Sequence, residues 1–185
     1  MYHSKQIFLT ILLATSLFSS CSKLILRASG NYITPKQESK NSILQFCNKK
    51  KVPYDALYMI KDEETYATLL KNKFTLPSIM IFDKNRNLIF NEGGETCHWK
   101  AMDAIRKDTI FIPIKNSNNA YDNFLQQTKA IQEKYRYEKY DYYLIAGWAK
   151  FTPKLTKALF NTVSDLYNST KLKVCIILLN EDNLY

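Results

Sequence analysis

The sequence predicts an α/β fold, a sandwich in which helices cover a mixed β-sheet. Short apolar runs typical of strands alternate along the chain with amphipathic segments typical of helices. The run over 142–148 is apolar and is expected to be a central strand. Hydrophobic residues make up 46% of the 185 residues, which is enough apolar material for a core.

The first elements follow from local signals. Pro35, after Thr34, suits the first turn of a helix expected over 35–50. A strand is expected over 54–60. Asp62 is a suitable N-cap for a helix over 62–72.

A hairpin comes next. The apolar runs 79–82 and 88–90 are joined by a polar loop, which predicts two antiparallel strands. A helix is expected over 95–106 and a strand over 109–114.

The last part of the chain alternates again. A long amphipathic helix is expected over 119–138, and the apolar strand 142–148 follows it. A helix over 152–168 and a strand over 173–179 complete the pattern. The tyrosines around residues 135–143 either form a ring-stacking surface for a ligand or pack a helix end onto a strand, and packing is the favoured interpretation.

Composition excludes several classes of site. Four glycines stand at positions that form neither a dinucleotide-binding fingerprint nor a P-loop. Two histidines, His3 and His98, are too few for sites built on several histidines once His3 is removed with a leader. We expect no metal and no cofactor. The formal charge is +9, carried by scattered lysines, and no nucleic-acid partner is expected.

The N-terminus has the features of a secretory signal. Lys5 supplies a positive charge, and an apolar run over 7–18 is too short to span a membrane. Ser19 and Ser20 then precede Cys21. This arrangement resembles a bacterial lipoprotein signal, which implies cleavage after Ser20 and lipidation of Cys21. An uncleaved anchor, or a plain secretory signal with an ordinary cysteine, remains the alternative.

The resemblance sets the expected organisation. Residues 1–20 are the signal peptide, 21–35 the lipidated N-terminus and tether, and 36–185 the folded domain, with 36–115 and 116–185 as conceivable sub-halves. The expected location is the cell envelope, facing the periplasm. The membrane is the expected partner through Cys21, with the outer membrane favoured because Ser22, not aspartate, follows that cysteine.

Two segments resemble parts of the thioredoxin fold. Residues 76–94 contain a proline, Pro77, at the head of a strand, then a hairpin and the pair Gly93-Gly94. Residues 143–182 resemble the strand, active-site helix and following strand. The resemblance implies a thioredoxin-like three-layer sandwich with a mixed sheet. Because the proline segment comes first, either one permuted sheet or two incomplete halves is expected.

The segment that resembles the active-site helix lacks the two cysteines of the thioredoxin dithiol. Thr152 and Leu155 occupy the two cysteine places, and threonine cannot exchange disulfides. Cys97 is the remaining candidate for a reactive thiol, because it lies near a helix start beside His98. Cys47 and Cys175 are expected in the core, and a Cys47–Cys97 disulfide is the alternative.

These observations predict a binding or accessory module rather than an enzyme. Its expected docking surface surrounds Pro77, Gly93, Gly94 and Trp148, for an envelope protein partner. The alternative is a single-thiol redox protein, carrying out thiol-disulfide or peroxide chemistry through Cys97 with His98 nearby. The paired acids Glu181 and Asp182 are interpreted as a strand end without acid/base chemistry.

Overall fold

The computed structural model of the chain describes residues 32–71, 75–94, 97–106, 114, 119–169 and 171–182. Within them lie five helices and six strands. In chain order these are α2 (Lys40–Lys50), β1 (Ala56–Ile60), α3 (Glu63–Lys71), β2 (Ser78–Asp83), β3 (Leu88–Gly93), α4 (Cys97–Arg106), α5 (Ala120–Gln127), β4 (Thr128–Glu133), β5 (Tyr142–Trp148), α6 (Pro153–Ser169) and β6 (Val174–Asn180).

The six strands form one mixed sheet in the order β3-β2-β5-β6-β1-β4. β6 is parallel to both of its neighbours, β5 and β1. β2 pairs antiparallel with β5 and with β3, and β4 pairs antiparallel with β1. Strands from residues 36–115 and 116–185 therefore interleave in a single sheet.

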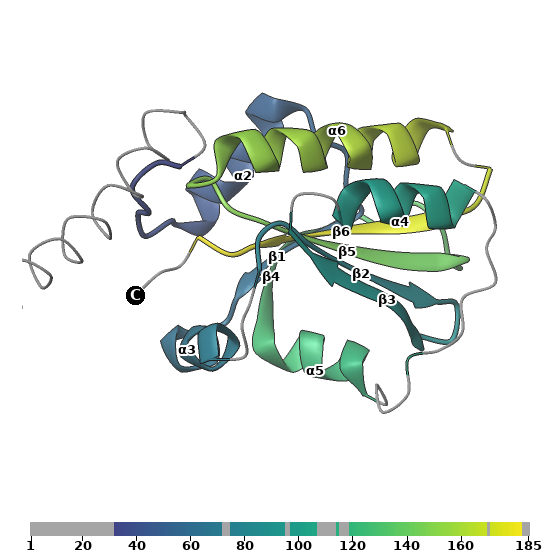
Figure 1. Ribbon diagram of the computed structural model, residues 1–185, viewed down its shortest axis with the longest axis horizontal. Helices are drawn as coiled ribbons and strands as arrows, with labels where there is room; N and C mark the ends of the chain where they lie inside the picture. The colour runs from purple at the N-terminus through teal and green to yellow at the C-terminus, as the bar shows by residue number, and fades with distance from the viewer. Residues whose placement is uncertain are drawn as a thin grey trace, which may run out of the picture.

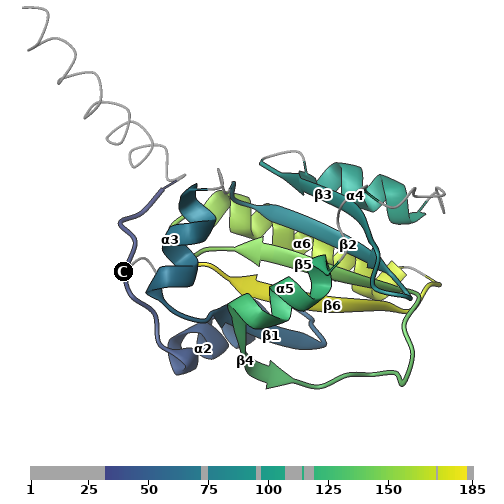
Figure 2. The same cartoon turned by 90° about the horizontal axis from the view of Figure 1, so that it is seen from below.

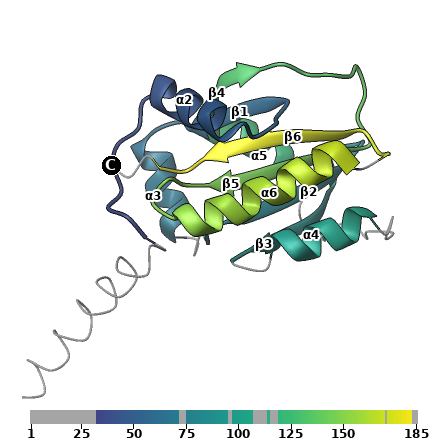
Figure 3. The same cartoon turned by 90° about the horizontal axis from the view of Figure 1, so that it is seen from above.

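Helices cover both faces of the sheet. Figure 1 shows α2, α4 and α6 above it and α3 and α5 below it, and we call these the upper and lower faces. Figures 2 and 3, seen from below and above, show the same division. The fold is thus a three-layer α/β arrangement, as the alternation of segments predicts.

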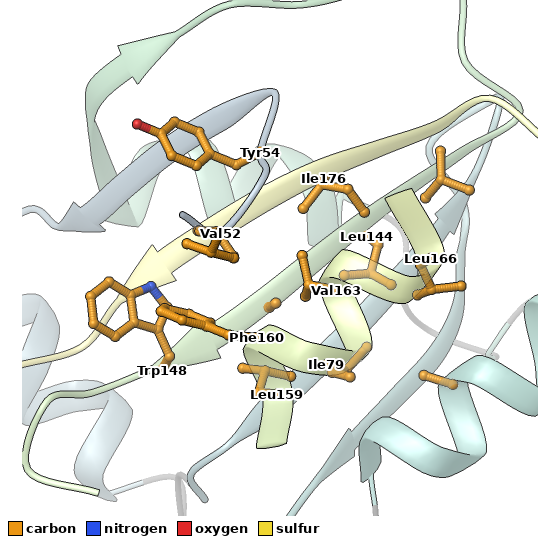
Figure 4. Packing of buried hydrophobic residues seen from close by; sticks show 14 of the residues in the cluster. Val52, Tyr54, Ile79, Leu144, Trp148, Leu159, Phe160, Val163, Leu166 and Ile176 are labelled. Atoms are coloured by element: carbon orange, nitrogen blue, oxygen red, sulfur yellow. The ribbon is translucent and has the colours of Figure 1, made fainter. Parts of the chain in front are cut away.

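The central strands are buried on both faces. In β6, Val174, Ile176 and Leu178 belong to the upper core, whereas Ile177 and Leu179 belong to the lower one. This alternation follows from the two-residue period of a strand. Figure 4 shows the upper core, in which side chains of α6 pack on β5 and β6.

Several predicted elements are confirmed. Asp62 accepts a hydrogen bond from the Thr65 amide at 2.9 Å, so it caps α3. The hairpin β2–β3, the strand β5 and the helix α6 lie where they were expected. The Leu76–Pro77 peptide bond at the head of β2 is cis.

The long helix expected over 119–138 is wrong. α5 ends at Gln127, and residues 128–133 form β4 at the edge of the sheet. The Thr128 hydroxyl donates to the Phe124 carbonyl at 2.7 Å, which satisfies one carbonyl at the helix end. Pairing of β4 with the exposed edge of β1 outweighs the helical periodicity of the segment.

The first helix begins later than predicted. Residues 32–39 have no regular secondary structure, and Ser39 is the N-cap, accepting from the Ser42 amide at 3.2 Å. A serine side chain at the N-cap accepts a hydrogen bond from a backbone amide of the first turn, whereas the ring of Pro35 has no acceptor atom.

The expected strand over 109–114 lies outside the described residues except for Ile114. The amide of Ile114 donates to the Leu88 carbonyl at 2.9 Å.

The tyrosines around 135–143 mainly pack against one another. Tyr140 is buried, and its ring centroid lies 5.5 Å from Tyr137 and 5.8 Å from Tyr143. The Tyr140 hydroxyl also donates to the buried Asp55 carboxylate at 3.1 Å. The rings pack, as the favoured interpretation predicts, but from the loop between β4 and β5 rather than from a helix end.

Candidate functional site

A cleft of about 550 Å³ opens on the lower face of the sheet, between α3 and α5. Figure 2 shows these two helices on the side of the viewer. Its apolar wall consists of Ile60, Leu69, Met80, Ala120, Phe124 and Leu179. The rest of its lining consists of Gly93 and of the polar residues Thr75, Ser78, Asn91, Glu92, Asn123, Gln127, Thr128 and Glu181.

The topology explains the position of the cleft. Ile60 and Leu179 stand at the carboxyl ends of the parallel strands β1 and β6, and Ser78 begins the antiparallel strand β2. In open α/β sheets, ligand sites form outside the carboxyl ends of strands. Small-molecule sites combine an apolar wall with convergent polar groups, and this cleft has both.

Glu181 is the most unusual group in this cleft. Its side chain is fully buried, and neither carboxyl oxygen has a hydrogen-bond partner of good geometry among the described residues. Burial raises its pKa well above the usual 4.5, and the neighbouring Asp182 carboxylate raises it further. The Ser78 hydroxyl favours the charged form and so lowers the pKa of Glu181, but by less than burial and Asp182 raise it. A buried acid with a displaced pKa beside a cleft is a candidate functional group.

Gly147 makes room for this carboxyl group. A Cβ at Gly147 would lie 2.1 Å from the Ser78 Oγ and 2.5 Å from the Glu181 Oε1. Both side chains therefore cross the bare backbone of β5. Any larger residue at this position would displace one of them.

Backbone contacts hold the segment after β6 in place. The Glu181 amide donates to the Trp148 carbonyl at 2.9 Å. The Asp182 carboxylate accepts from the Lys150 amide and from the Asn180 side-chain amide, at 2.8 and 2.7 Å. Burial raises the pKa of Asp182, and these hydrogen bonds oppose the rise.

Part of the expected docking surface adjoins the cleft. Gly93 lines it, and Pro77 is buried directly before Ser78. The Gly94 amide donates to the Pro77 carbonyl at 2.8 Å, and Gly94 has a φ of +98°, which favours glycine.

The placement of Trp148 on that surface is wrong. Trp148 is fully buried on the upper face, with its ring stacked on Phe46 at 5.3 Å and against Phe160 at 5.0 Å. Figure 4 shows the Trp148 and Phe160 rings together. The interpretation failed because the sequence does not reveal that α2 covers the end of β5.

Cys97 does not have the exposure that a reactive thiol requires. It is fully buried at the start of α4, and its Sγ donates to the Pro77 carbonyl at 3.6 Å. The side chain of its neighbour His98 lies outside the described part of the structure. Such burial disfavours attack on a substrate in solution.

Cys47 and Cys175 lie in the core as expected. Burial raises the pKa of Cys47 to about 12 and that of Cys175 further. No disulfide joins any two of the three described cysteines. Thr152 is one of the two residues that the resemblance aligns with a dithiol, and its hydroxyl donates to the Ala149 carbonyl at 3.1 Å.

The N-terminal predictions lie outside the described residues, including the signal peptide over 1–20 and Cys21. In the described ranges, no helix is long and apolar enough to cross a membrane. The same ranges contain no group of three or more histidine, cysteine, aspartate or glutamate side chains that could hold a metal ion.

Comparison with known proteins finds no match to this chain among family models, curated proteins or solved structures. The geometry of the chain itself therefore carries the functional argument.

Sequence analysis missed Glu181. The acidic pair Glu181-Asp182 was interpreted only as the end of a strand. A usable signal was present, because the pair directly follows the apolar run over 174–179. Acids at the carboxyl end of a central strand reach the edge where α/β sheets form ligand sites.

Proposed function

We propose that the chain is a non-catalytic binding module of the bacterial cell envelope, anchored to the membrane through lipids on Cys21. The cleft between α3 and α5 is its binding site. The observation that carries this proposal is the unpartnered, buried carboxyl group of Glu181 beside a cleft of about 550 Å³. Natural proteins satisfy nearly all buried polar groups, so an orphaned carboxyl in a cleft is consistent with a partner that the ligand supplies.

The elements around the cleft support a permuted thioredoxin-like core. β2, β3 and α4 follow Pro77 in the order that the resemblance implies, and β5, α6 and β6 supply its strand, helix and strand. β2 pairs antiparallel with β5, so both units contribute to one sheet although β2 precedes β5 in the chain.

Burial of the thiols favours binding over redox chemistry. Cys97 was the candidate for a single-thiol reaction, and its sulfur lies in the upper core, on the opposite side of the sheet from the cleft. A ligand in the cleft therefore meets Ser78 and Glu181 rather than a thiol.

The binding proposal can be tested with a matched pair of variants. Asn123 on α5 lines the cleft and is exposed, whereas Asn161 is exposed on α6 of the upper face. Asn123→Trp should fill the cleft without removing a core contact, and Asn161→Trp is the control. The measurement is an NMR fragment screen of the purified full chain, in which backbone amide shifts locate each bound fragment.

We expect fragments that shift amides around the cleft in the wild type and in Asn161→Trp. The same fragments should lose their effect in Asn123→Trp. Binding that is scattered over the surface, or that survives in Asn123→Trp, would overturn the proposal.

A further inference from the structure

We propose that the ligand of the cleft is an organic cation, an alkylammonium group on an apolar chain, whose nitrogen pairs with the carboxylate of Glu181. This inference rests on the proposed function, because it assumes that the cleft is the binding site. It adds the chemical class of the ligand.

The charges around the cleft favour a cation. Glu92 and Glu181 both line it, whereas no lysine, arginine or histidine belongs to its described lining. Lys100 pairs with Glu92 at 2.7 Å, but both side chains are well exposed and screened by water. The described lining therefore places no positive charge against an incoming cation, although the whole chain carries +9.

Glu181 lacks the donor that an ammonium group supplies. A primary ammonium carries three N–H donors and no acceptor, and an ionised carboxylate accepts at both oxygens. The two carboxyl oxygens have no hydrogen-bond partner in the described structure. An incoming cation would provide both the donor and the opposite charge that a buried carboxylate requires.

The apolar wall accounts for the rest of the ligand. Leu69, Met80 and Phe124 line the cleft together with Ile60 and Leu179. Burial of an aliphatic chain against them removes apolar surface from water and adds affinity that does not depend on charge. An ammonium group on a short alkyl chain would pair with the Glu181 carboxylate and pack against the apolar wall.

Binding is coupled to the release of a proton. In the free cleft, burial favours the neutral acid form of Glu181, and the cation enters in its ammonium form. The acid then loses its proton to solvent, and the ammonium remains paired with the resulting carboxylate. Affinity should therefore rise with pH, up to tenfold for each unit over which free Glu181 is protonated.

The groups that face Glu181 do not produce the same dependence. Ser78 on β2 does not ionise in this range, and the pKa of Tyr66 on α3 is raised by burial, so its phenol stays neutral at moderate pH. Asp182 follows Glu181 and accepts from the Lys150 amide. Glu92 on β3 also lines the cleft, but its carboxylate pairs with Lys100. Glu138 is exposed and lies outside the cleft lining, so its replacement controls for a general loss of negative charge.

The test compares hexylammonium chloride with 1-hexanol, which has the same chain and no charge. Each is titrated into the purified full chain between pH 5.5 and 8, and dissociation constants are taken from amide shifts around the cleft. Glu181→Gln is the test variant, because glutamine matches the shape of the neutral acid and cannot ionise. Glu138→Gln is its control.

We expect hexylammonium to bind at least tenfold more tightly than hexanol at pH 8, with an affinity that falls as pH falls. Glu181→Gln should lower that affinity at least tenfold and remove most of its pH dependence. Glu138→Gln should change the affinity less than threefold and keep the pH dependence.

Equal affinities for hexylammonium and hexanol in the wild type would overturn the choice of a cation. The proposed function would stand in that case, because the cleft would still bind both molecules. Unchanged hexylammonium binding in Glu181→Gln would overturn the role of that carboxyl. The proposed function fails separately, when no fragment of any charge binds the cleft in the screen described above.

Discussion

Gly147 and Glu181 share one space at the centre of the sheet. A Cβ on Gly147 would lie 2.5 Å from the Glu181 Oε1 and 2.9 Å from its Cδ, so the carboxyl group occupies the volume that a side chain on β5 would fill. The missing side chain at Gly147 on β5 thus leaves the space that the Glu181 carboxyl group, directly after β6, occupies.

Gly147→Ala should destabilise the protein by about 1–3 kcal/mol, the usual cost of overpacking a core. The cost should be smaller in a Glu181→Ala background, because the colliding carboxyl is then gone. A double-mutant cycle by urea denaturation measures this coupling. Strictly additive effects would show that the two positions do not share the space.

Glu181 should make the protein less stable as pH rises. Its pKa in the folded protein lies above the unfolded value of 4.5, so the folded state keeps a proton that the unfolded chain has released. Above pH 4.5 and up to the folded pKa, the free energy of unfolding should fall by up to about 1.4 kcal/mol per pH unit.

Glu181→Gln removes this contribution and should have the higher Tm at pH 7. Asp182, whose pKa is also raised by burial, leaves a residual slope of the same sign in the variant. Calorimetry between pH 4 and 8 measures both curves. Superimposable curves would contradict the raised pKa of Glu181.

The buried ion pair between Asp55 and Arg136 should contribute more to the free energy of unfolding than the exposed pair between Lys100 and Glu92. Arg136 donates to the Asp55 carboxylate from Nε at 2.7 Å and from a terminal nitrogen at 3.0 Å. Arg136→Met should cost about 2–3 kcal/mol, the lower end for a broken buried pair, because the guanidinium is a quarter exposed.

Lys100→Met breaks the exposed pair with Glu92 and should change the free energy of unfolding by less than about 1 kcal/mol. Chemical denaturation of the two variants provides the comparison. Similar costs for both would show that burial of Asp55 does not strengthen its pair.

The three core thiols should react slowly in the folded protein. Cys47, Cys97 and Cys175 are all buried, so alkylation needs an opening of the core. Iodoacetamide labelling followed by mass spectrometry should be roughly 100-fold or more slower than in guanidinium. Rapid labelling of Cys97 alone would restore the redox alternative.

The proposed envelope anchor depends on Cys21. We expect the wild-type protein in the membrane fraction and labelled by palmitate, because several acyl chains hold a protein firmly. Cys21→Ser should release it into the soluble fraction, and Cys47→Ser should not. Membrane association that persists without the thiol would favour the uncleaved anchor.

The fold class could be predicted because strong local patterns persist in the structure. The run over 142–148 is β5, and the helix expected over 152–168 is α6. The error at 119–138 arose because β4 is defined by its partner β1, a contact that no local period encodes.

The site was harder to predict for the same reason. Gly93 was placed near a binding surface by its hairpin, and it lines the cleft. Glu181 is recognisable as a site residue only once β5 and β6 are known to pair, because this pairing brings Gly147 next to its carboxyl group. Trp148 was misplaced because its cover, Phe46, is about a hundred residues away in the chain.

The most direct test is a pH titration of the Glu181 carboxyl carbon by NMR in the full chain, with ¹³C-labelled glutamate and Glu181→Gln to assign the signal. The account predicts a chemical shift that stays constant as pH passes 4.5 and a midpoint well above that value. A midpoint at or below 4.5 would mean that the carboxylate is solvated or already paired, which contradicts its role as the group that awaits a ligand in the cleft.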